Sequence, residues 1–118
     1  MSETLAKLTE RLVAFRDERD WAQFQGLKNL IVSLNLESAE LLELTQWQDD
    51  ASVEKLIGDP EFSENLKEET ADVLLYLLLI CERAGIDLAA AAAKKIDINA
   101  QKYPVEKSRG NSKKYTLL

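Results

Sequence analysis

Histidine is absent from this sequence of 118 residues, and its absence removes several kinds of catalytic site. Without histidine, the chain has neither the Ser-His nor the Cys-His pair that activates a nucleophile. The Glu-x-x-His motif of di-iron carboxylate bundles is excluded for the same reason, and a zinc site is disfavoured. Any chemistry must therefore depend on carboxylates, lysines, water and a hard metal ion.

Cysteine and long apolar runs are also scarce. The single cysteine, Cys81, cannot form an internal disulfide, and we predict that it packs as a small apolar side chain. The longest apolar run, from Val73 to Cys81, is far shorter than the ~20 residues that a membrane span requires. With no recognisable signal peptide at the amino terminus, the sequence predicts a cytoplasmic protein.

Positive charge is in the minority, with 15 lysines and arginines against 21 aspartates and glutamates and a net charge of −6. This balance argues against a nucleic-acid polymer or an anionic membrane as the main partner. A single nucleotide is still compatible with it, because a nucleotide needs only a local cationic pocket.

Apolar residues recur at helical spacing along most of the chain, which predicts an all-α fold. We expect four long helices packed as a four-helix bundle and a short helix capped by Ser52, over residues 3–19, 27–47, 52–57, 60–84 and 88–102. The second long helix is apolar on more than one side, which implies burial within a bundle or against a second subunit. We divide the chain into a helical domain, residues 1–105, and a polar cationic tail, residues 106–118.

Two acid-x-x-acid pairs interrupt the apolar helices: Glu37 with Glu40, and Glu69 with Asp72. Residues at i and i+3 lie on one helix face, roughly 5–6 Å apart at Cβ. A carboxylate in apolar surroundings is costly unless it is neutralised, paired or bound to a metal. If the two helices pack antiparallel, the four carboxylates converge on one site suited to Mg²⁺, or to Mn²⁺. The alternative is that both pairs are solvated, as such pairs often are on helix surfaces.

Two tryptophans each have a structural and a ligand-binding interpretation. Trp21 is either a core anchor or one wall of a pocket. Trp47, expected to close the second long helix, is either a hydrophobic end-cap or a ring that stacks on a base. The sequence pattern leaves both alternatives open.

Cationic and amide side chains gather towards the carboxyl terminus. Lys95, Asn99 and Lys102 share one helical stripe, which would suit a phosphate chain, although lysines also favour a helix C-terminus electrostatically. Lys28 is either solvated or placed to meet an anion at a helix N-terminus. The tail is either disordered or a mobile flap that orders on an anionic ligand.

Taken in order, these motifs resemble the MazG-like superfamily of all-α nucleoside triphosphate pyrophosphohydrolases, and within it the dCTP pyrophosphatase branch. The resemblance extends from about residue 5 to the tail. It is carried by Arg19-Asp20-Trp21, Glu37-x-x-Glu40, Glu69-x-x-Asp72, Lys95-x-Asp97-x-Asn99, Tyr103-Pro104-Val105 and Ser108-Arg109-Gly110.

The resemblance implies Mg²⁺-dependent hydrolysis of a dCTP-like nucleoside triphosphate to the monophosphate and pyrophosphate, by a homodimer or a homotetramer. The metal ligands would be Glu37, Glu40, Glu69 and Asp72, with Glu37 or Glu40 also orienting the attacking water. Phosphate and sugar would be contacted by Lys95, Asn99, Arg109 and Lys114. From their charge and position alone, we add Lys28 and Lys102 to the residues predicted to contact phosphate or sugar. The base would be framed by Trp21, Trp47, Tyr76 and Tyr103.

Two other functions are open on the same fold. A catalytically idle nucleotide-binding regulator would be stabilised by nucleotide without releasing pyrophosphate. A helical interaction module would carry the acids as surface charges, and its thermal stability would not depend on Mg²⁺.

Overall fold

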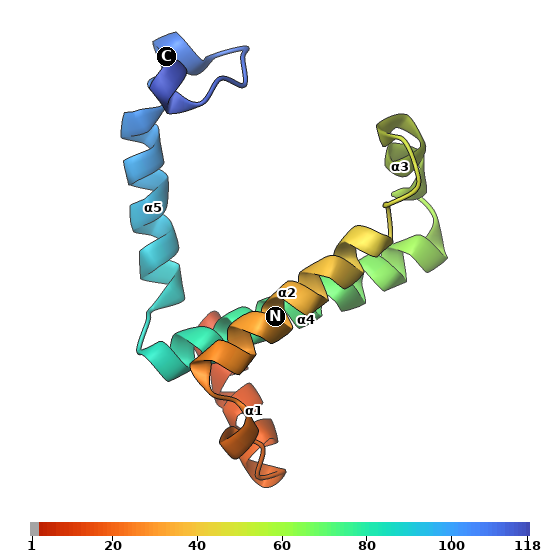
Figure 1. Cartoon of the computed structure of the whole chain (residues 1–118), viewed down its shortest axis with the longest axis vertical. Helices are drawn as coiled ribbons and strands as arrows, with labels where there is room; N and C mark the ends of the chain where they lie inside the picture. Colours follow the sequence, from red (N-terminus) through yellow and green to blue (C-terminus); the bar gives the residue numbers. More distant parts are fainter. Residues whose placement is uncertain (1–2) are drawn as a thin grey trace. The chain divides into compact units, whose positions relative to one another are not determined.

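The computed structural model describes residues 3–118, and over these residues the chain is all-α with no strand. Six α-helices and two short 3₁₀ helices, η1 and η2, follow one another along the chain (Figure 1). In order they are α1 Leu5–Glu18, η1 Ala22–Phe24, α2 Leu27–Glu43, α3 Asp50–Leu56, α4 Pro60–Ala84, α5 Leu88–Lys102, α6 Val105–Ser108 and η2 Tyr115–Leu117. No helix in the described part is both long and apolar enough to cross a membrane.

The helix ends lie mostly where capping residues predict them. The side chain of Asp59 accepts a hydrogen bond from the Phe62 amide and begins α4, with Pro60 as its first residue. Gly85 ends α4 in the left-handed conformation, at φ 68°, which a residue without Cβ adopts at little cost. The side chain of Asp87 accepts from the Ala90 amide and begins α5. These three predicted boundaries are confirmed.

Two predicted boundaries are wrong. The side chain of Asp49, not Ser52, caps α3, and its Oδ1 accepts from the Ser52 amide at 2.8 Å. The second long helix ends at Glu43, because the amide of Thr45 and its hydroxyl both donate to the carbonyl of Leu42. This tight turn replaces the next helical hydrogen bonds, so Trp47 lies beyond the helix.

The chain forms two compact units, one ending at Gly85 and one beginning at Ile86. In the first unit, α2 and α4 lie side by side and run in opposite directions, and α1 also packs on α4 (Figure 1). The buried apolar side chains among the described residues of this unit are Leu30, Leu78, Leu79 and Cys81. The predicted burial of Cys81 is therefore confirmed, whereas the packing of all four long helices in one bundle stays a prediction.

The connection between α1 and α2 is held by local contacts around Trp21. Its ring meets Phe15 edge to face with centroids 5.7 Å apart, and the guanidinium of Arg19 lies 3.7 Å from the centre of the Phe15 ring. Asp20 has a positive φ of 54°, and the Nε2 of Gln23 donates to its carbonyl and to its carboxylate. Asp tolerates this conformation better than most residues, so the chain turns sharply just before Trp21.

In the second unit, the tail folds back on the end of α5. The rings of Tyr103 and Tyr115 meet edge to face at 6.0 Å, and the Nζ of Lys102 lies 4.8 Å from the centre of the Tyr115 ring. These contacts attach η2 to the carboxyl end of α5. The functional division of the chain at residue 105 stays a prediction.

Candidate functional site

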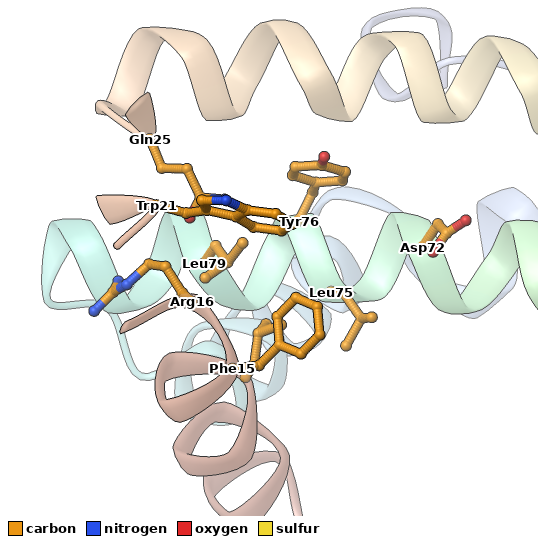
Figure 2. A pocket seen from close by; sticks show the side chains of 9 residues that line it. Phe15, Arg16, Trp21, Gln25, Asp72, Leu75, Tyr76 and Leu79 are labelled. Carbon is orange, nitrogen blue, oxygen red and sulfur yellow. The ribbon is translucent and has the colours of Figure 1, made fainter. Parts of the chain in front are cut away.

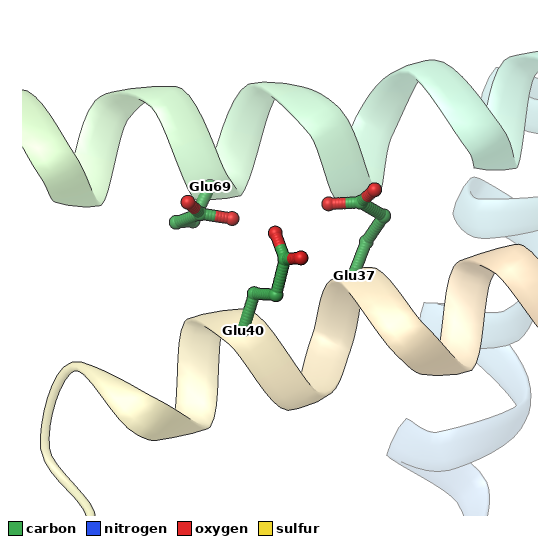
Figure 3. Close-up of side chains that lie close together, drawn as sticks. All are labelled: Glu37, Glu40 and Glu69. Carbon is green, nitrogen blue, oxygen red and sulfur yellow. The ribbon is translucent and has the colours of Figure 1, made fainter.

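Three of the four predicted acidic residues converge between α2 and α4. Glu37 and Glu40 project from α2, and Glu69 projects from α4 towards them (Figure 3). Each residue offers one carboxylate oxygen, and these oxygens lie within 4.8 Å of one another. The arrangement follows from the i, i+3 spacing on α2 and from the antiparallel packing of the two helices. We call these three residues the acidic cluster.

Nothing in the described part of the chain neutralises the acidic cluster. None of the ion pairs formed by residues 3–118 includes Glu37, Glu40 or Glu69. The Oε2 atoms of Glu37 and Glu69 are buried and accept no hydrogen bond. Buried oxygens are normally satisfied, because an unsatisfied one loses its hydration without compensation. The donor set, all carboxylate oxygens, fits a hard divalent cation such as Mg²⁺.

The pKa values of the acidic cluster also favour a bound cation. Burial raises the pKa of the Glu37 carboxyl, and the negative charges of Glu40 and Asp72 raise it further. Burial also raises the pKa of Glu69, again with Glu40 and Asp72 adding to the effect. The carboxylates thus repel one another, and a cation between them would remove that repulsion.

Asp72, the fourth predicted ligand, lies one helical turn after Glu69 on α4. Its charge acts on both Glu37 and Glu69, so it belongs to the same electrostatic site. It is not among the three residues whose oxygens meet within 4.8 Å. Instead, it lines a pocket that adjoins the acidic cluster.

This pocket has a volume of about 220 Å³ and lies between α1, the α1–α2 connection and α4 (Figure 2). Its walls are largely apolar and aromatic, and its polar groups come from Arg16, Gln25, Asp72 and Tyr76. Two of the predicted base-binding residues, Trp21 and Tyr76, line it. An apolar pocket with a few polar groups suits a planar ligand. A cation held by the neighbouring carboxylates would suit a negatively charged group at one end of that ligand. The remaining lining residues are Leu12, Phe15, Leu75 and Leu79.

The other predicted site residues are not among those lining this pocket. Trp47 lies in the turn after α2 and is 88% exposed, so the end-cap interpretation is wrong. Lys28 is exposed in the first turn of α2. The remaining predicted residues belong to the second unit, and their contact with a ligand stays a prediction. They are Lys95, Asn99, Lys102, Tyr103, Arg109 and Lys114.

The sequence analysis missed two polar residues of the pocket, Arg16 and Gln25. The side chain of Arg16 is only 15% exposed, and its guanidinium donates to Asp17 and to Glu82, each at 2.9 Å. The pKa of Arg16 is raised, chiefly by its hydrogen bond to Asp17 and then by that to Glu82. The contact between Arg16 and Glu82 joins α1 to α4, and no local sequence pattern indicates it. Gln25 stands next to Gly26, a turn signal, in the region where this chain departs from the family that it resembles by lacking a histidine that some relatives carry.

Comparisons with known proteins show the family to which the chain belongs. Residues 32–118 match the sequence model of the MazG-like family. The chain is 42% identical to rat dCTP pyrophosphatase 1 over 115 residues, which are 98% of this chain and 68% of that protein. It is 39% identical to the human dCTP pyrophosphatase 1 over the same shares of the two chains.

Among solved structures, a pyrophosphatase from Archaeoglobus fulgidus superposes with a TM-score of 0.79 at 36% identity. The superposition covers 88% of this chain and 95% of that chain. The chain therefore belongs to the MazG-like family of all-α proteins. Within that family, its relatives identify it as a pyrophosphatase.

We expect Glu69→Gln to raise the unfolding temperature of the metal-free protein at pH 7, because it removes one of the mutually repelling charges. The folded-state pKa of Glu69 is raised, so its contribution to stability is present below its unfolded-state pKa and is lost as the pH rises through the folded-state pKa. The gain from the amide should therefore shrink as the pH falls towards about 4. Calorimetry in EDTA across this pH range measures the difference.

Glu64→Gln is the matched control, since Glu64 is an exposed acid on α4 paired only with Lys67. It should change the unfolding temperature little at any pH. A lower unfolding temperature for Glu69→Gln at pH 7, or a difference independent of pH, would contradict the assignment of repulsion to the acidic cluster.

Proposed function

We propose that the chain is a Mg²⁺-dependent nucleoside triphosphate pyrophosphohydrolase that converts a dCTP-like substrate to the monophosphate and pyrophosphate. The observation that carries this proposal is the acidic cluster, in which the buried Oε2 atoms of Glu37 and Glu69 have no hydrogen-bond partner, beside an aromatic-lined pocket. The 42% identity to rat dCTP pyrophosphatase 1 supports the same substrate class.

Glu37, Glu40 and Glu69 would hold Mg²⁺, with Mn²⁺ as a substitute, and Asp72 would complete the set of four. When bound, the divalent ion supplies charge neutralisation at the phosphate oxygens. Either Glu37 or Glu40 would orient the attacking water and receive its proton, as the bond from the water oxygen to the α-phosphorus forms and the bond from that phosphorus to the bridging oxygen of the departing pyrophosphate breaks. The negative charge of Glu40 acts on Glu37, so the protonation of one carboxyl depends on that of the other. We therefore assign the activation of water to the pair Glu37 and Glu40 and not to one of them.

In this proposal the aromatic pocket binds the base. Trp21 and Tyr76 offer ring faces within one cavity, next to Asp72 and hence next to the metal ligands. Tyr103 and Trp47 are further candidates for contact with the base. Phosphate and sugar would be contacted by Lys28, Lys95, Asn99, Lys102, Arg109 and Lys114.

The proposed assembly is a homodimer or a homotetramer. Helix α2 exposes several large apolar side chains that the first unit leaves uncovered: Ile31, Val32, Leu36 and Leu42, which are 44% to 63% exposed. A second copy of the chain is the partner we propose for this face.

The enzymatic proposal predicts Mg²⁺-dependent pyrophosphate release, strongest for dCTP or its 5-substituted forms and abolished by EDTA. Glu40→Gln and Asp72→Asn should each lower kcat/KM by about tenfold to 100-fold or more, since each removes a charge from the metal site. Pyrophosphate release from a panel of canonical and modified triphosphates measures this. Glu64→Gln, on the exposed side of α4, is the control and should leave the rate unchanged.

Near-normal turnover of both variants at saturating Mg²⁺ would sink the assignment of a shared metal site. Stabilisation by dCTP without any pyrophosphate release would instead indicate a nucleotide-binding regulator. A thermal stability that changes with neither Mg²⁺ nor nucleotide would indicate an interaction module.

The two tryptophans proposed to contact the base can be tested by separate substitutions and steady-state kinetics. Trp21→Ala removes a wall of the pocket, and we expect KM for dCTP to rise about tenfold or more with a smaller change in kcat, because stacking serves ground and transition states alike. Trp47→Ala tests the second tryptophan proposed to contact the base, which is 88% exposed in the first unit and is not among the residues that line this pocket. Steady-state kinetics on dCTP measure both. An unchanged KM for Trp21→Ala would contradict the proposal that the base binds in this pocket.

For the assembly, we expect a particle mass of two or four chains by light scattering at micromolar concentration. Leu36→Glu places a charge on the exposed apolar face of α2, at a side chain that is 63% exposed in the single chain, and should lower this mass. Glu64→Gln again serves as the surface control. A monomeric mass for the unaltered protein would contradict the proposed assembly.

A further inference from the structure

The last cationic side chain of α5 is restrained by an aromatic ring and not by a carboxylate. The Nζ of Lys102 lies 4.8 Å from the centre of the Tyr115 ring, and the lysine is partly buried. None of the ion pairs formed by residues 3–118 includes Lys102. A carboxylate would cancel the charge of the ammonium, whereas a ring face attracts the ammonium and leaves its charge in place. Lys102 therefore keeps a full positive charge for an anion.

The Tyr115 ring is itself held in position. It meets the ring of Tyr103 edge to face, with centroids 6.0 Å apart, and Tyr103 directly follows Lys102 at the end of α5. The Tyr103 amide donates to the Asn99 carbonyl at 2.9 Å, which ties that residue to the helix. Tyr115 also begins the η2 turn, which the Leu117 amide closes on the Lys114 carbonyl at 2.8 Å.

The loop that returns Tyr115 to α5 is closed by the side chain of Asn111. Its Nδ2 donates to the Lys107 carbonyl, and its Oδ1 accepts from the Lys113 amide, each at 3.0 Å. Gly110, just before it, adopts a positive φ of 76°, which favours glycine. Through these contacts the chain reverses after α6, so a tail residue reaches a lysine that lies far earlier in the sequence (Figure 1).

A simpler explanation covers only part of this arrangement. A lysine in the last turn of a helix is stabilised by the negative end of the helix dipole, and Lys102 stands there. This accounts for the cation and gives no role to the ring that the tail brings to it. Glu106 is the only acidic side chain among residues 98–118, so the surroundings along the chain favour an anionic ligand of Lys102.

We propose that Tyr115 is a positioning residue, which holds the Lys102 ammonium at the end of α5 for a phosphate oxygen of the triphosphate. This inference rests on the proposed function, because it assumes that Lys102 contacts the phosphates of a nucleotide. The ring engages one side of the ammonium, so N–H donors remain for the phosphate. Because the ring restricts the lysine before the ligand arrives, less conformational entropy is lost when the phosphate binds.

Two substitutions of Tyr115 separate the ring from the rest of the side chain. Tyr115→Phe keeps both the face under Lys102 and the edge-to-face contact, and it should leave the kinetics close to those of the unaltered protein. Tyr115→Leu removes the ring, and KM for dCTP should rise about twofold to fivefold with a smaller change in kcat. Steady-state kinetics at saturating Mg²⁺ measure both variants.

A double substitution tests whether Tyr115 acts through Lys102. Lys102→Met should raise KM by itself, and adding Tyr115→Leu to it should raise KM no further, because the ammonium that the ring holds is already gone. A merely structural role of Tyr115 would add its full effect in the Lys102→Met background, and this outcome overturns the inference. An unchanged KM for Tyr115→Leu or for Lys102→Met overturns it as well.

Leu117→Ala is the matched control, since Leu117 lies in the same η2 turn and is 71% exposed. It should leave KM at the value of the unaltered protein. If Leu117→Ala raised KM as much as Tyr115→Leu does, a general disturbance of the tail would explain both results, and the role of the ring would be wrong.

Binding distinguishes this inference from the proposed function. If no triphosphate releases pyrophosphate, the proposed hydrolysis fails, and titration calorimetry of dCTP with Ca²⁺ then decides the role of Tyr115. Weaker binding by Tyr115→Leu, with Tyr115→Phe binding as the unaltered protein does, supports positioning by the ring. Equal affinities of all three proteins, or no binding by any of them, overturn it.

Discussion

The convergence of like charges between two antiparallel helices is the constraint on which the rest of this structure depends. Glu37, Glu40 and Glu69 meet within 4.8 Å, and no cation of the described chain opposes them. Such an arrangement is unfavourable on its own, so the packing of α2 on α4 must hold it. That packing buries Leu30 from one helix and Leu78 and Leu79 from the other. Apolar burial thus maintains a site that repulsion would open, and a bound divalent ion would relieve that repulsion.

Next to this charged site, the α1–α2 connection contributes to a pocket whose walls are largely apolar and aromatic. Asp20 at φ 54° turns the chain, so that Trp21 meets Phe15 edge to face. The ion pair between Arg16 and Glu82 joins α1 to the carboxyl end of α4. Asp72 links the two parts, since it lines the pocket while its charge acts on the acidic cluster. A nucleotide likewise has two parts: an aromatic base, which would suit the pocket, and phosphates, which would suit a cation held by the acidic cluster.

Local sequence signals predicted the helices well where a capping residue stood beside a clear apolar period. Asp59 with Pro60, Gly85 and Asp87 mark the ends of α4 and the start of α5 as expected. The prediction was wrong where two polar residues competed. Asp49 capped α3 in place of Ser52, and the turn at Thr45 ended α2 before Trp47. The energies that separate such alternatives are about 1 kcal/mol, which a sequence pattern does not resolve.

The sequence by itself determined the all-α class and the acidic pairs, because both follow from residue spacing on a helix. It also supplied the family resemblance, which the comparisons confirm. Only the tertiary structure decided which residues meet. It brought Glu69 to Glu37 and Glu40, set Asp72 at the pocket, and left Trp47 exposed. It also brought Arg16 and Gln25 to the same cavity. The physical reason is that helical spacing fixes only the face on which a residue lies, whereas packing between helices fixes what that face meets.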